Sequence, residues 1–142
     1  MENAITTYEP RMETRSISTI SDDSPQSKLQ VIAAVNSAAS LNDYIEENGN
    51  KPIRVVAIFT MPGIRKSRQA GVPDMPCQNT YLITEDGLSL MSQSDGIYRS
   101  VAVITSMFPS LCVDGESVGI DIKVGSKKHK NGNTIKTLVP VI

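Results

Sequence analysis

The chain has 142 residues and a formal net charge of −1, so its size fits one domain with a modest core and its overall charge does not indicate a polyanion-binding protein. No apolar run reaches the roughly 18 residues of a membrane span, and a single histidine leaves little material for a metal cluster or a Ser-His-Asp triad. The charge is unevenly distributed, because residues 1–50 carry three basic and eight acidic residues (−5) whereas residues 51–142 carry eleven and seven (+4).

The N-terminal segment, residues 1–26, is polar and rich in Ser, Thr and Glu. Such a segment buries too little apolar surface to offset the entropy lost on ordering, so we expect a flexible tail in front of a folded domain at residues 27–142. A few apolar residues of the tail are candidates for docking on a neighbouring subunit: Tyr8, Met12, Ile17 and Ile20.

Two short helices are predicted after the tail, at about residues 28–48. The first is indicated by a partial apolar stripe and several alanines over residues 27–39. Ser40 is a good N-cap for the second, with Asp43 at the acidic position of a capping box, and Gly49 marks its end.

From Pro52 onward the sequence is typical of β-structure. Residues 53–61 are almost continuously apolar, which indicates a strand buried on both faces. Two further strands are expected at 79–84 and 88–91, joined by a tight turn that ends on Gly87. The segment between the first two strands, residues 62–76, is predicted to be a loop.

A third helix is predicted to begin after Ser94, a favourable N-cap, with Asp95 at the positive end of the helix dipole. Apolar residues follow at spacings of four, three and four and define one apolar face: Ile97, Val101, Ile104 and Phe108. Pro109 ends the helix, because proline cannot continue it and disfavours helical geometry in the residue before it.

The C-terminal part is predicted to be a hairpin with a basic tip. Apolar residues alternate with polar ones over residues 118–124, and the chain returns over residues 134–139. The tip between them carries several cations and closes on an Asn-Gly dipeptide that suits a tight turn. A two-stranded finger with a cationic tip is better suited to a polyanion than to a small substrate.

The predicted order is strand, strand, strand, helix, strand, strand, which is the order of the OB-fold. We therefore expect a mainly β protein built as a five-stranded Greek-key barrel, with a helix between its third and fourth strands and short helices before it. In this fold the loops joining strands one and two, and strands four and five, flank the nucleic-acid-binding face. These are the two basic loops of this chain.

The candidate nucleic-acid-binding residues fall into three groups. The loop residues are Arg65, Lys66, Arg68, Lys127, Lys128, His129 and Lys130; the strand cations are Arg54, Lys123 and Lys136; the aromatic candidates for base stacking are Phe59 and Tyr81. Lys123 and Lys136 are expected to be cross-strand neighbours, although lysines there also blunt a sheet edge. Tyr81 is expected to be half-exposed, whereas Phe59 also fits a core position.

The C-terminal two-thirds, about residues 52–142, resembles small single-stranded DNA-binding proteins encoded by phages and conjugative plasmids of Gram-positive bacteria. The resemblance rests on the run from Asn79 to Gly87, on Ser92-Gln93-Ser94-Asp95-Gly96-Ile97-Tyr98-Arg99-Ser100, and on the closing Lys-Asn-Gly-Asn-Thr-Ile-Lys-Thr-Leu. It implies an OB-fold that coats single-stranded DNA with little sequence preference during replication or transfer. It also implies a tail, residues 1–26, that reaches the next protomer and makes binding cooperative.

We therefore expect a cytoplasmic, non-enzymatic protein without cofactor, metal site or membrane association, whose partner is single-stranded DNA. Cys77 and Cys112 show no metal or redox spacing; they could pair with each other, but buried free thiols are expected in a reducing cytoplasm. Three alternatives stay open: binding of RNA, binding of duplex, and an interaction or assembly module in which the basic loops are merely solvated.

Overall fold

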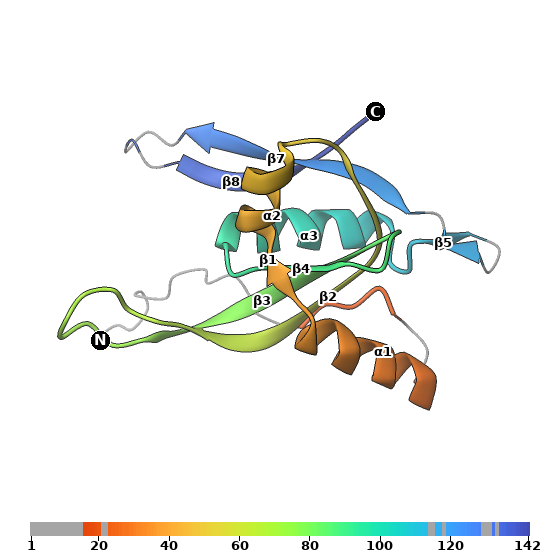
Figure 1. Ribbon diagram of the computed structural model, residues 1–142, viewed down its shortest axis with the longest axis horizontal. Helices are drawn as coiled ribbons and strands as arrows, with labels where there is room; N and C mark the ends of the chain where they lie inside the picture. The colour runs from red at the N-terminus through yellow and green to blue at the C-terminus, as the bar shows by residue number, and fades with distance from the viewer. Residues whose placement is uncertain (1–15, 21–22, 114–115, 118, 129–131, 133) are drawn as a thin grey trace, which may run out of the picture.

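The computed structural model describes residues 16–20, 23–113, 116–117, 119–128, 132 and 134–142. Its elements are α1 (Pro25–Asn36), β1 (Ala39–Ser40), α2 (Leu41–Asn48), β2 (Ile53–Arg65), β3 (Met75–Thr84), β4 (Ser89–Ser92), α3 (Asp95–Met107), β5 (Cys112–Val113), β6 (Glu116–Ser117), β7 (Ile120–Lys128) and β8 (Thr134–Pro140). It is a mixed α/β structure with one main sheet and three helices (Figure 1).

Six strands form the main sheet in the order β1-β4-β3-β2-β7-β8, curled into a half-barrel. All neighbours are antiparallel except β1 and β4, which run parallel. The predicted mainly β, five-stranded OB-fold barrel is not confirmed, since the sheet has an additional strand and, among the described residues, β8 pairs with β7 alone.

Helix α3 packs against β8 and β3 on the inner side of the curled sheet. The amide of Leu138 on β8 donates to the Ser100 hydroxyl of α3 at 3.0 Å, so the helix satisfies part of the strand edge left open by the sheet. Gly96 allows this approach, because a Cβ there would collide with the carbonyl oxygen of Lys136.

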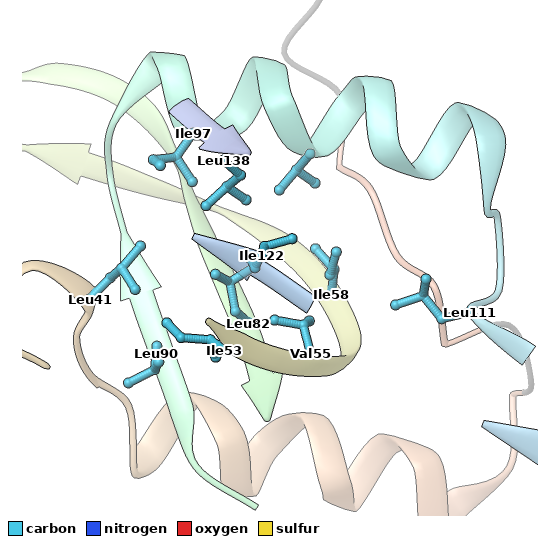
Figure 2. Packing of buried hydrophobic residues seen from close by; sticks show 11 residues of the cluster. Leu41, Ile53, Val55, Ile58, Leu82, Leu90, Ile97, Leu111, Ile122 and Leu138 are labelled. Atoms are coloured by element: carbon cyan, nitrogen blue, oxygen red, sulfur yellow. The ribbon is translucent and has the colours of Figure 1, made fainter. Parts of the chain in front are cut away.

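The largest apolar cluster lies between the sheet and helices α2 and α3, and Figure 2 shows its side chains converging beneath α3. A second cluster fills the space between the opposite face of the sheet and α1. Strand β2 contributes to both clusters, with Ile58 in the first and Phe59 in the second. The prediction of a strand buried on both faces is confirmed.

Local signals in the sequence located the helix starts well. Ser40 and Ser94 accept hydrogen bonds from Asp43 and Ile97 as the predicted N-caps, and Gly49 ends α2 with φ +80°. The first helix runs from Pro25 to Asn36, earlier than the predicted 27–39, because Ser24 acts as its N-cap.

Two segments differ from expectation. The predicted loop 62–76 is shorter, because β2 and β3 stay paired as far as Arg65 and Met75. Residues 16–20, assigned to the tail from composition, lie along β2: the amide of Thr19 donates to the carbonyl of Ile58 at 2.8 Å, and that of Thr60 to Ile17 at 2.8 Å. Ile17 and Ile20 thus pack on their own sheet. Residues 1–15 lie outside the described part of the chain.

Candidate nucleic-acid interface

A cleft of about 1060 Å³ opens where four parts of the fold meet: the outer end of the β2–β3 hairpin, the β4–α3 junction, the start of α2 and the start of β8. The outer end of the β2–β3 hairpin, the end of β7 and the start of β8 lie on the same side of the molecule, at the left of Figure 1. Residues 64–68 of the first basic segment line the cleft, and on the β7–β8 side it is lined by the start of β8, residues 134–136, which follows the second basic segment.

Cationic side chains dominate this cleft. The described residues of its walls include five of them and one carboxylate, that of Asp95, a net charge of +4 for these residues in a chain whose total is −1. The cations are Arg65, Lys66, Arg68, Arg99 and Lys136. A concave wall lined by charge of one sign concentrates counter-ions and attracts an anionic chain.

Four of the five cations were predicted, and the structure brings together residues up to 71 positions apart, from Arg65 to Lys136. The Lys136 ammonium donates to the Asn42 side-chain carbonyl at 2.7 Å, which holds it over the start of α2. Arg99 was not predicted. It lies within the run that carries the family resemblance, but its place on the exposed side of α3 depends on how the helix docks.

Arg65, the last residue of β2, connects the hairpin to the start of α3. Its guanidinium donates to the backbone carbonyl of Gln93 and, at 3.2 Å, to the carboxylate of Asp95. The Gln93 amide nitrogen donates in the reverse direction, to the Ile64 carbonyl at 3.2 Å and to the Asn79 side chain at 3.0 Å. This network fixes one wall of the cleft against the other.

The other predicted cations that the structure describes lie outside the cleft. Arg54 forms an ion pair with Asp121 at 3.2 Å and with Glu85 at 3.7 Å, at the far end of β2 from the cleft. Lys127 and Lys128 are exposed at the end of β7, towards the tip of the hairpin. His129 and Lys130 lie outside the described residues.

The expected pairing of Lys123 with Lys136 is wrong. Lys123 is opposite Val139, and Lys136 is opposite Ser126. The hairpin register is shifted by three residues from the one assumed, because β7 extends to Lys128 instead of ending near Val124. Lys123 thus lies further from the cleft than Lys136 does along the hairpin.

The aromatic candidates are buried. Phe59 and Tyr81 are 3 % and 5 % exposed, and their rings stack on each other with centroids 4.8 Å apart. The expectation of a half-exposed Tyr81 is wrong, because α1 covers this face of the sheet with Ala34, Val31 and Val35. In this arrangement neither ring offers a face to a nucleic-acid base.

Cys77 is a buried free thiol on β3, as expected. Burial raises the pKa of this thiol; the nearby Arg65 guanidinium acts to lower the pKa and the Asp95 carboxylate to raise it. The side chain of Cys112 lies outside the described part of the structure.

The described residues contain no group of three or more His, Cys, Asp or Glu side chains arranged to hold a metal ion. Within the same part of the chain, no helix has the length and apolar character needed to cross a membrane. Comparisons with models of known protein families, with curated proteins and with solved structures find no match to the chain.

Proposed function

We propose that this protein binds single-stranded DNA without sequence preference and coats it during plasmid transfer or the replication of a phage or plasmid. The observation that carries the proposal is the convergence of five cations from β2, its following loop, α3 and β8 on one cleft, whose described lining contains a single carboxylate. Several cations on one cleft suit the repeated phosphates of a nucleic-acid strand.

The chemistry of the cleft walls favours contact with the backbone over reading of bases. Among the described residues that line it there is no aromatic side chain, so base stacking contributes little to affinity. Lys and Arg contacts to phosphate carry no sequence information. Binding of this kind is independent of sequence and strongly dependent on salt.

The arrangement of strands also supports an OB-type binding face. In that fold the loops after the first and fourth barrel strands flank the nucleic acid. The corresponding connections here are the β2–β3 and β7–β8 hairpins, and residues from both line the cleft. The cytoplasm is the proposed location, and contacts through the part of residues 1–26 that precedes residue 16 are the proposed source of cooperativity along the strand.

Fluorescence anisotropy with a labelled thymine oligomer of roughly 60 nucleotides tests the proposal. The expected result is saturable binding that weakens as salt rises and that excess duplex does not displace. Competition with an RNA oligomer of equal length decides between the two kinds of single strand. Absence of binding even at low salt would overturn the proposal and favour the alternative of an interaction or assembly module.

A further inference from the structure

Asp95 is the one acidic residue among the described residues that line the cationic cleft. Its carboxylate lies 3.2 Å from the Arg65 guanidinium, and both side chains are partly open to solvent, at 64 % and 42 % exposure. An exposed ion pair of this kind contributes little to stability, so it can be broken with little effect on the fold.

We propose that Asp95 occupies Arg65 in the free protein as an internal stand-in for a nucleic-acid phosphate, and so limits the affinity of the cleft. This inference rests on the proposed function. A phosphate oxygen and a carboxylate oxygen are both anionic acceptors of guanidinium hydrogen bonds, so they compete for the same donors. A strand that binds in the cleft must either displace Asp95 from Arg65 or bind next to the negative charge of the Asp95 carboxylate, which repels phosphate.

The pair is not required to hold the hairpin in place. Arg65 also donates to the Gln93 carbonyl, and the Gln93 amide bonds to Ile64 and Asn79. These contacts remain when the carboxylate is removed. Release of Arg65 from Asp95 therefore leaves the structure of this wall of the cleft unchanged. It also makes the Arg65 guanidinium available to a phosphate.

The test is the substitution Asp95→Asn in the full chain, with anisotropy measured on the same thymine oligomer over a range of salt. Since the carboxylate competes for one cation, the variant is expected to bind about fivefold more tightly at low salt, the upper range for an exposed ion pair. Its plot of log affinity against log salt is expected to be steeper by about 0.7, the value of one added phosphate contact on a single strand.

The chain offers a closely matched control. Asp121 lies 3.2 Å from Arg54, and this arginine is as exposed as Arg65, at 43 %, but the pair lies outside the cleft. Asp121→Asn removes the same charge and is expected to leave affinity and salt slope unchanged. Asp95→Glu keeps the charge and is expected to keep the wild-type slope.

The outcomes separate the two proposals. If the wild-type protein does not bind, the proposed function fails and this inference fails with it. If the wild-type protein binds but Asp95→Asn binds equally well or more weakly, only the competitor role is overturned. Equal tightening by Asp121→Asn would also overturn it, because the effect would then come from net charge. Thermal unfolding of each variant checks that loss of a carboxylate from the first turn of α3 leaves the chain folded.

Discussion

Lys66 and Arg68 are the cleft residues least involved in holding the fold, since they lie in the connection between β2 and β3 and both are exposed. Replacing both with alanine is expected to weaken DNA binding to all sequences alike and to flatten the salt slope by about 1.4, the value of two phosphate contacts on a single strand. Anisotropy titrations at several salt concentrations measure both quantities.

The matched control for that double variant is Lys28→Ala with Lys51→Ala, which removes two exposed cations outside the cleft. If it weakens binding as much as Lys66→Ala with Arg68→Ala, then the cleft is not the binding surface. Stability should be unaffected in either variant, because substitutions on an exposed surface usually change the free energy of unfolding by less than about 0.5 kcal/mol.

Cys77 provides a pH-dependent test of the packing beneath the cleft. Burial raises the pKa of its thiol, so the folded chain keeps this proton to a higher pH than the unfolded chain does. Its contribution to stability is therefore present at neutral pH and is lost as pH rises through the ordinary thiol range and then through the raised pKa. Urea unfolding at neutral and alkaline pH is expected to show a smaller alkaline loss for Cys77→Ala than for the wild-type chain; an equal loss would contradict the assignment.

The sequence predicted single residues well where local chemistry decides and poorly where packing decides. Ser40, Ser94 and Gly49 have roles that depend on their own backbone, and all three were assigned correctly. Tyr81 was misjudged because its exposure depends on α1, an element about 50 residues earlier whose docking no local pattern reveals. Arg99 was missed for the same reason. The sequence pattern of a helix shows which face is apolar, but it does not show which elements lie near the polar face.

Among the elements, the packing of α1 on the β2–β3 pair indicates that Phe59 and Tyr81 are structural residues. Phe59→Leu is expected to lower the free energy of unfolding by roughly 1–2 kcal/mol, because it removes a stacked aromatic ring and leaves a space in the cluster. DNA affinity of the folded variant should not change. Urea unfolding and anisotropy on the same preparation measure the two effects.

Phe108 supplies the control for this substitution, since it lies 53 % exposed at the end of α3. Phe108→Leu is expected to leave stability almost unchanged. If Phe59→Leu instead weakens DNA binding and keeps full stability, the ring stacks on bases, and α1 must then move away when DNA binds.

Element order was predictable from periodicity and turn chemistry, but the way the sheet closes was not. The strands at β2, β3, β4, β7 and β8 and the helix α3 all follow the predicted order. The added strand β1 has two residues, too short to leave a pattern, and it pairs with a strand 51 residues further along the chain, β4. The extension of β2 to Arg65 was hidden by Pro62 and Gly63, residues that usually interrupt a strand but here belong to a two-stranded hairpin.

For the molecule as a whole, positive charge is concentrated in the cleft of a nearly neutral chain. The salt dependence of binding therefore measures how many cations contact DNA. With Arg65 held by Asp95, the four other cleft cations correspond to a slope of about −2.8 in log affinity against log salt on a single strand. A steeper slope would mean that the strand contacts cations besides these four, such as the lysines of the β7–β8 tip. Replacing Lys127, Lys128 and Lys130 with alanine would then flatten the slope towards about −2.8, by about 0.7 for each lysine that had been bound to a phosphate. If the wild-type slope is already about −2.8 and the triple variant does not change it, the tip lysines lie outside the interface and the cleft alone holds the strand.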